Sequence, residues 1–227
     1  MEVKEDRSEQ ILLLHEGKDR ARPSHTGAYD KTILCAACDN ILARYETYAY
    51  ERLQAWRLQP SPVGKFATVD DLDGDTMVRF AAGLAWKYAV TSEARGRIDV
   101  GPYADVLRDV ALGGASIPES LDVAMVRIFE RGDVYYYREP LLDRQEGVNF
   151  VRFCVGGFLF FLKIDKRRSM RMFPADSWLR GRTSGRIPTV LPEQVEEGRS
   201  CAQLVGRPEV RKFFQTARER KSARRGA

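Results

Sequence analysis

The sequence predicts an α+β fold in which a helical part precedes an antiparallel sheet. Apolar residues first recur every three or four positions, as in the run from Ile41 to Trp56, which is the period of helices that bury one face. From Val123 the pattern changes to short segments rich in β-branched and aromatic residues, separated by glycine turns. This change of period indicates helices followed by hairpins.

The chain has 227 residues, which is enough to bury a core without disulfide bonds. Hydrophobic residues make up 44% and charged residues 30%, so most of the chain should fold. We expect four parts: an irregular N-terminal segment at 1–30, the CxxC motif and helical part at 31–115, an antiparallel β part at 116–192 and a basic C-terminal extension at 193–227.

Three helices are expected in the helical part. The first begins near Asp39, which has the chemistry of an N-cap, and it ends before Pro60. The second follows the acidic segment Val69–Asp75 and is apolar on most of its sides, so it should lie at the centre of the core. The third begins at Gly101-Pro102 and stops at Gly113, because proline is tolerated in a first turn and glycine ends helices.

Four strands, joined as an antiparallel meander, are expected in the β part. They are Val123–Glu130, Val134–Tyr137, Val148–Val155 and Phe158–Ile164, with hairpin turns at Arg131–Asp133 and Gly156–Gly157. The segment Met170–Pro192 is expected to be irregular, and Glu209–Arg224 to form a basic helix. Among the aromatic residues of these strands, Tyr135–Tyr137, Phe150 and Phe153 could present rings on one sheet face, although alternation should turn about half of them into the core.

The net charge of +5 is concentrated at the C-terminal end. Residues 207–227 hold eight basic and two acidic side chains, so this segment carries +6 and the other 206 residues carry −1. Such a segment can bind a phosphate backbone or another acidic surface without sequence preference, or it can serve only to keep the chain in solution. The side chains expected to make charge contacts are Arg211, Lys212, Arg218, Arg220 and Lys221, together with a second basic cluster at Lys166, Arg167 and Arg168.

The longest apolar run, Phe153–Leu162, has ten residues, whereas a helix that spans a bilayer needs about 20. The charged start of the chain does not resemble a signal peptide. We therefore expect no membrane segment and a cytoplasmic location. Four cysteines in a chain of this length do not suggest a disulfide framework.

The local motif with the strongest chemical content is Cys35-Ala-Ala-Cys38, directly before the first predicted helix. Two thiolates at this spacing can face one tetrahedral zinc ion, as in a treble-clef or HNH-type finger. His15 and His25, the only histidines, could complete a Cys₂His₂ set. The alternatives are a finger that keeps its shape without metal, and a redox pair, which would need a βαβ context that the sequence does not show.

The segment from Gly27 to Ala49, GAYDKTILCAACDNILARYETYA, resembles a family of uncharacterised bacterial proteins with an LCxxCDxxxxxYExYA motif. Shorter patches similar to that family follow in the same order, up to about residue 166. The resemblance implies a degenerate HNH, treble-clef-like zinc finger. The family's first CxxC and its Ser-His-Ile-Ile-Pro segment are absent from this chain, and no histidine follows Cys38, so a hydrolytic centre is not expected.

These observations favour a binding or accessory protein without catalytic residues, associated with nucleic acid or an acidic protein through its basic C-terminal segment. Zinc is the one cofactor that the sequence suggests. Two alternatives stay open. One is a metal-dependent nuclease with a reduced HNH site, and the other is a protein–protein interaction module that uses aromatic residues of the 134–162 sheet.

Overall fold

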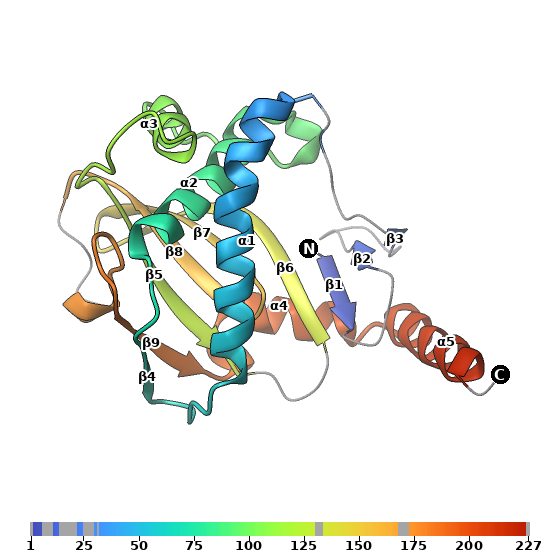
Figure 1. The fold of residues 1–227 in the computed structure, drawn as a ribbon. Coiled ribbons are helices and arrows are strands. Elements are labelled where there is room, and N and C mark those ends of the chain that lie inside the picture. The colour runs from blue at the N-terminus through green and yellow to red at the C-terminus, as the bar shows by residue number, and fades with distance from the viewer. Residues whose placement is uncertain are drawn as a thin grey trace.

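The computed structural model describes residues 2–5, 11–13, 22–24, 30, 32–129, 134–167 and 173–225. These residues contain five α-helices and a mixed β-sheet, which confirms the predicted α+β class (Figure 1). The helices are α1 (Ala36–Leu58), α2 (Gly74–Val90), α3 (Tyr103–Ala111), α4 (Glu196–Val205) and α5 (Pro208–Arg225). The strands are β1 (Glu2–Glu5), β2 (Ile11–Leu13), β3 (Arg22–Ser24), β4 (Phe66–Val69), β5 (Leu121–Ile128), β6 (Val134–Gln145), β7 (Val148–Val155), β8 (Phe158–Ile164) and β9 (Gly185–Val190).

The described strands lie in the order β3-β2-β1-β6-β7-β8-β5-β9-β4. Most neighbours are antiparallel, but β5 and β9 pair in parallel, with Arg127 opposite Thr189. The predicted antiparallel meander is therefore wrong in two respects. The sheet is mixed, and β5 pairs with β8 rather than with β6, because the chain crosses over after β5 and returns to it through the β6–β7–β8 hairpins.

Residues 1–30 were expected to be irregular, yet their described parts form three short antiparallel strands, and β1 extends the sheet beyond β6. The segment Met170–Pro192 was also expected to be irregular, but it contains β9. Both differences have one physical cause. A strand of three to six residues within a larger sheet needs no strong pattern of its own, because its neighbours in the sheet supply the backbone hydrogen bonds.

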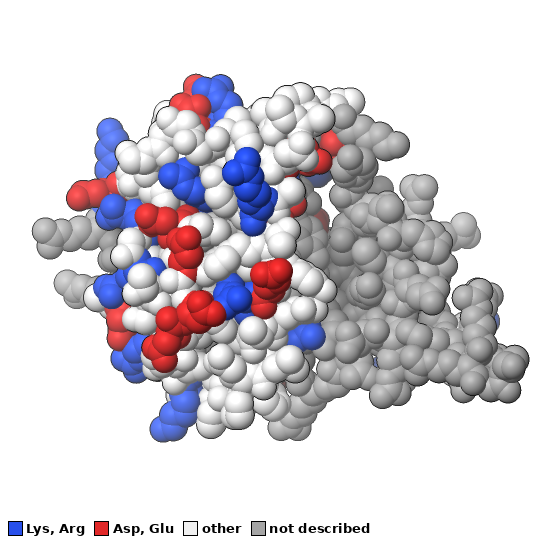
Figure 2. Space-filling model, in the orientation of Figure 1, with Lys and Arg blue, Asp and Glu red and all other residues white. Residues whose placement is uncertain are grey.

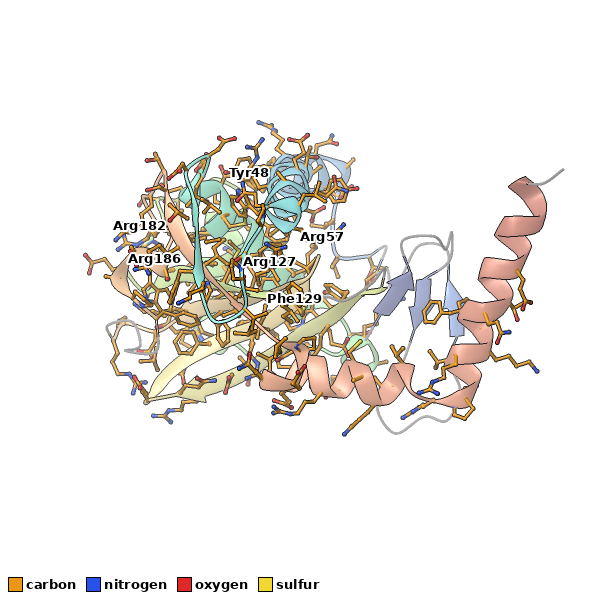
Figure 3. All side chains as sticks on the ribbon, turned by 90° about the horizontal axis from the view of Figure 1, so that it is seen from below. Tyr48, Arg57, Arg127, Phe129, Arg182 and Arg186 are labelled. Atoms are coloured by element: carbon orange, nitrogen blue, oxygen red, sulfur yellow. The ribbon has the colours of Figure 1, made fainter. Side chains whose placement is uncertain are left out.

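Helices cover both faces of the sheet, and a separate hydrophobic core lies between the sheet and the helices on each face. Figure 3 shows α1 and α2 on one side of the sheet and α4 on the other. The first core packs α1, α2 and α3 against residues such as Phe153 and Phe160, whose rings stack 4.8 Å apart. The second packs Phe150 and Phe161 against Phe173, Trp178 and the helices α4 and α5.

Phe150 and Phe153 are both fully buried, on opposite faces of β7. The expectation that the sheet presents aromatic rings to a ligand is therefore wrong for these two residues. The simple alternation of buried and exposed positions fails here because α4 and α5 cover the second face. The side chains of Tyr135 and Tyr136 lie outside the described residues, as does the expected turn at Arg131–Asp133, whereas the turn at Gly156–Gly157 is confirmed.

The helices differ from their predicted bounds mainly at their ends. α1 begins at Ala36 with Cys35 as its N-cap, so Asp39 lies in the first turn rather than at the cap. α2 begins where the acidic segment predicted it, with Asp73 as N-cap accepting a hydrogen bond from the Thr76 backbone N–H at 2.9 Å. None of the helices in the described part of the chain is long and apolar enough to cross a membrane.

Candidate functional site

The two cysteines of the CxxC motif lie at the start of α1. Cys35 is exposed and caps the helix, and its Sγ accepts a hydrogen bond from the backbone N–H of Cys38 at 3.4 Å. Cys38 lies in the first turn and is partly buried. A sulfur atom serves as an N-cap because it accepts a hydrogen bond from an amide that has no partner within the helix.

This geometry makes the two thiols chemically different. The pKa of Cys35 is lowered, first by the backbone N–H of Cys38 and then by the Cys38 thiol. The pKa of Cys38 is raised, because its proton is held in the hydrogen bond to Cys35, because burial disfavours its charged form, and because a second negative charge beside Cys35 is unfavourable. Cys35 is therefore the thiol that ionises first.

Of the four residues predicted to bind zinc, Cys35 and Cys38 lie within the described part of the chain. His15 and His25 lie outside the described part of the chain. Among the residues that the structure describes, no group of three or more histidine, cysteine, aspartate or glutamate side chains could hold a metal ion. The local geometry of a thiol pair at a helix start is present, whereas the four-ligand finger stays a prediction.

Asp30 anchors the segment that leads into the motif. Its carboxylate accepts hydrogen bonds from the hydroxyls of Thr91 and Thr32, both at 2.7 Å, and it forms an ion pair with Arg95 at 3.5 Å. These contacts, those of Thr91 and then Thr32 above all, lower the pKa of Asp30 to about 2. The chain before α1 is thereby held against the C-terminal end of α2.

A groove runs beside the start of α1, between α1, α2 and β6. It consists of two hollows of about 360 and 340 Å³ that share Glu46, Leu84 and Tyr137. The first hollow is lined by Ile33, Leu34 and Asp39, among others, and these residues flank the two cysteines in sequence. Volumes of this size are typical of small-ligand pockets.

The polar groups in the groove are largely paired with one another. The ammonium group of Lys87 contacts the carboxylate of Glu46, and the hydroxyl of Tyr137 donates a hydrogen bond to that of Tyr88 at 3.1 Å. The groove therefore offers an apolar floor with internally neutralised polar groups rather than a strongly charged site.

The basic residues predicted to bind nucleic acid lie in two different parts of the fold. Arg211 and Lys212 are exposed on α5, while the side chains of Arg218, Arg220 and Lys221 lie outside the described residues, although α5 itself extends past them. Lys166 and Arg167 follow β8, and Arg168 lies outside the described residues.

Arg167 has a local partner that sequence reasoning missed. Its guanidinium binds both carboxylate oxygens of Asp165, at 2.9 and 2.7 Å, and this contact is the first cause of a pKa of Asp165 well below the usual range. A bidentate pair of this kind orients the side chain towards the protein. Within the Lys166–Arg168 cluster, Arg167 is therefore committed to an ion pair within the protein.

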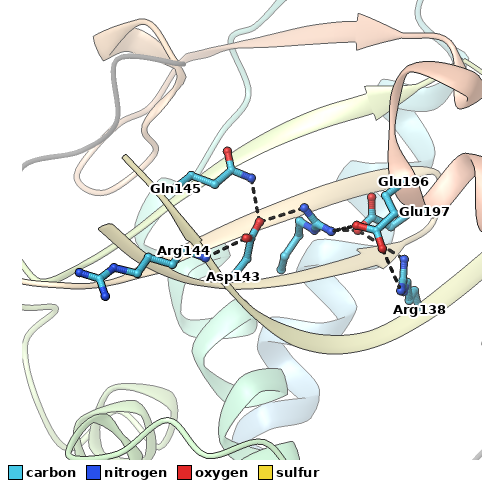
Figure 4. Close-up of polar contacts among 7 residues, drawn as sticks. Arg138, Asp143, Arg144, Gln145, Glu196 and Glu197 are labelled. Atoms are coloured by element: carbon cyan, nitrogen blue, oxygen red, sulfur yellow. Dashed lines mark hydrogen bonds and ion pairs between the residues drawn. The ribbon is translucent and has the colours of Figure 1, made fainter. Parts of the chain in front are cut away.

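Sequence reasoning also missed the ionic network that holds α4 on the sheet (Figure 4). Arg152 on β7 binds Asp143 at 2.9 Å, Glu196 at 2.6 Å and Glu197 at 2.7 Å. Arg138 on β6 lies 3.8 Å from both glutamates. A sequence signal existed, since two adjacent glutamates precede Cys201 and Leu204 at helical spacing, but their partners lie more than 40 residues away.

On the face of the body shown in Figure 2, basic and acidic side chains alternate without a large patch of one sign. The segment with the largest excess of basic residues in the sequence is α5, with seven basic and two acidic residues. Comparison of the chain with family models, curated proteins and solved structures finds no match.

Proposed function

We propose that this protein is a non-catalytic accessory protein that binds nucleic acid through α5. The observation that carries the proposal is how α5 is attached. Val210 and Phe214, in its first two turns, are buried in the second core, while the rest of the helix extends away from the sheet in two views (Figures 1 and 3). The anchor holds the base of the helix on the body of the protein and leaves its later, basic turns projecting from it (Figures 1 and 3).

The charge of α5 suits a polyanion. The helix holds seven basic and two acidic residues, so it carries a net charge of +5. Double-stranded DNA presents one negative charge per roughly 1.7 Å of axis, and each lysine or arginine placed on a phosphate releases condensed counterions. Contacts of this kind give affinity without sequence preference.

Several contacts hold the helix that precedes α5 on the sheet. α4, which leads into α5, is held to the sheet by the Arg138 and Arg152 network and by the buried side chains of Cys201 and Leu204. Anchoring a basic helix in this way reduces the freedom that is lost when it docks on a ligand.

The test is a truncation that removes residues 217–227 and keeps Val210 and Phe214 in the core. It deletes five basic residues and one acidic residue, Glu219. We expect the Kd for a fluorescent duplex to rise at least about tenfold at low salt, and the slope of log Kd against log salt to fall by up to about four units.

The matched control lowers the net charge by the same four units elsewhere. Its substitutions to glutamine are at the exposed residues Arg44, Lys65, Arg97 and Arg182. If the basic residues of α5 bind the duplex, the Kd of this variant should lie within about twofold of the wild-type Kd. If only the net charge of the protein matters, its Kd should equal that of the truncated protein. Equal Kd and equal salt slope for truncated and full-length protein would refute the proposal, and binding of an acidic protein alone would replace nucleic acid as the ligand.

A further inference from the structure

Cys35 and Cys38 are a pair of thiols at the start of α1, where Cys35 is the N-cap and Cys38 lies in the first turn. Cys35 is exposed, and its sulfur lies over the first turn of α1, where it accepts the Cys38 N–H at 3.4 Å. Cys38 is partly buried and lies three residues further along the same turn, with its backbone N–H held on the Cys35 sulfur. The Cys35 sulfur is therefore the more accessible of the two to an incoming reagent, and Cys38 is close enough in the chain to resolve a disulfide formed there.

The remaining cysteines have the opposite environment. Cys154 on β7 is fully buried, and Cys201 on α4 is 6% exposed, both within the second core. Buried thiols of this kind behave as small apolar side chains and react slowly. The protein thus separates two reactive positions from two inert ones, and the inert pair serves as an internal control.

We propose that Cys35 and Cys38 form a thiol–disulfide exchange site whose substrate is a disulfide, with Cys35 as the attacking sulfur and Cys38 as the resolving one. Such chemistry needs a thiol pair at a helix start and access from solvent, both of which are present without a thioredoxin-like βαβ unit.

The substrate disulfide is the oxidant, and it accepts the two electrons that the cysteine pair loses. Cys35, as thiolate, attacks one substrate sulfur. The Cys35–substrate S–S bond forms as the substrate S–S bond breaks, and the other substrate sulfur leaves and takes up the proton that Cys35 lost. Cys38 then gives up its proton and attacks Cys35 Sγ, which releases the second substrate sulfur as a thiol. The cysteine pair is oxidised by two electrons, and the substrate disulfide is reduced to two thiols.

The substrate reaches Cys35 from solvent, and the first hollow of the groove begins beside it at Leu34 and Asp39. A low-molecular-weight disulfide and a disulfide in an extended peptide share the required chemistry. A peptide that also contacts the apolar floor of the groove should react faster than glutathione disulfide at equal concentration, and equal rates would assign the substrate to the small-molecule class.

The experiment uses the full-length reduced protein and follows intact mass over time after addition of glutathione disulfide or a peptide disulfide. Wild-type protein should lose two hydrogens and release two substrate thiols, with Cys35 joined to Cys38 in the peptide map. Cys38→Ser should instead accumulate one mixed disulfide at Cys35. Cys35→Ser should react at least roughly tenfold more slowly at Cys38, because the exposed attacking sulfur is gone.

Two results would overturn the proposal. One is a mixed disulfide at Cys38 in Cys35→Ser that forms as fast as the adduct at Cys35 in Cys38→Ser. The other is about one zinc per chain, measured by elemental analysis, that protects both thiols from the disulfide until a chelator is added. Unchanged circular dichroism and unmodified Cys154 and Cys201 show that each variant is folded.

Discussion

Arg152 illustrates, at the scale of one residue, how this protein balances burial against charge. Burial alone would lower the pKa of its guanidinium, but the carboxylates of Glu197, Glu196 and Asp143 outweigh that effect and raise the pKa. Glu197, at 1% exposure, is the most enclosed of the three partners. A buried charge of this kind is stable only while its partner is present.

We therefore predict that Glu197→Ala lowers the free energy of unfolding by about 3–5 kcal/mol, because Arg152 and Arg138 would lose the carboxylate that they share. Urea unfolding followed by tryptophan fluorescence measures this change. The exposed Glu193, a few residues earlier, provides the control, since Glu193→Ala should change stability by less than about 0.5 kcal/mol. A loss for Glu197→Ala below about 1 kcal/mol would contradict this account of the network.

Asp30 gives the pH-dependent prediction at the same scale. Its pKa is lowered to about 2 from 3.8, chiefly by the Thr91 and Thr32 hydrogen bonds, so its contribution to stability is present above about pH 4 and is lost as pH falls towards 2. Asp30→Asn removes that contribution. The difference in urea midpoint between wild type and variant should therefore shrink over this range, and a difference that stays constant from pH 6 to pH 2.5 would contradict the assignment.

At the scale of elements, the close approach of α2 to the 179–182 loop depends on one glycine. Gly74 opens α2, and its backbone N–H donates to the carbonyl of Arg182 at 2.9 Å. A Cβ at this position would overlap the carbonyl oxygen of Leu179. Because the obstacle is backbone, neither partner can yield by turning a side chain.

We predict that Gly74→Ala destabilises the protein by at least about 2 kcal/mol, since the helix or the loop must move. Thermal unfolding measures the loss. Gly114→Ala is the matched control, because its Cβ would have ordinary van der Waals contact with the nearest atom, 3.6 Å away, and it should leave the melting temperature within a few degrees. Similar melting temperatures for both variants would show that the loop is not tightly packed on α2.

Another junction between elements lies at the end of α1 (Figure 3). Arg127 on β5 donates one hydrogen bond to the carbonyl of Gln59 at 2.6 Å and another to the carbonyl of Arg57. These carbonyls have no partner within the helix, so a strand residue satisfies them. The position at which α1 meets the sheet is thus determined by a residue 70 positions away in sequence.

At the scale of the whole molecule, the C-terminal extension is part of the fold. α4 and the first turns of α5 cover the second face of the sheet, where Phe150, Phe161 and Trp178 would otherwise be exposed. The chain therefore consists of a sheet between two helical layers, with the free part of α5 as a projection.

This arrangement predicts different results for two truncations. Deletion of residues 207–227 removes Val210 and Phe214 from the second core and should cost at least about 3 kcal/mol, as Phe→Ala in a core does. Deletion of residues 217–227 should leave the urea midpoint nearly unchanged. Equal midpoints for the two truncated proteins would mean that α5 is not part of the core.

Much of the fold could be predicted from periodicity. The α+β class, the bounds of β7 and β8, the helix at 103–111 and the basic helix α5 all match their sequence patterns closely. β4 and β9 were missed because they are short, and α4 because its buried positions include Glu197 and Gly198 and so carry little apolar periodicity. β6 was predicted only to Tyr137 because its later residues Glu139, Pro140 and Asp143 break the usual strand composition. Of the candidate site, the sequence identified the thiol pair and the basic helix.

The sequence by itself determined the local chemistry of this protein. A cysteine pair before an amphipathic run, a cluster of basic residues at the C-terminal end and alternating apolar segments are properties of neighbouring residues, and short-range hydrogen bonds and side-chain periodicity act on them directly. Only the tertiary structure decided which strand pairs in parallel, that both sheet faces are buried, and that α5 is anchored by Phe214. Those outcomes depend on contacts between residues far apart in the chain, where burial and charge pairing outweigh local preference.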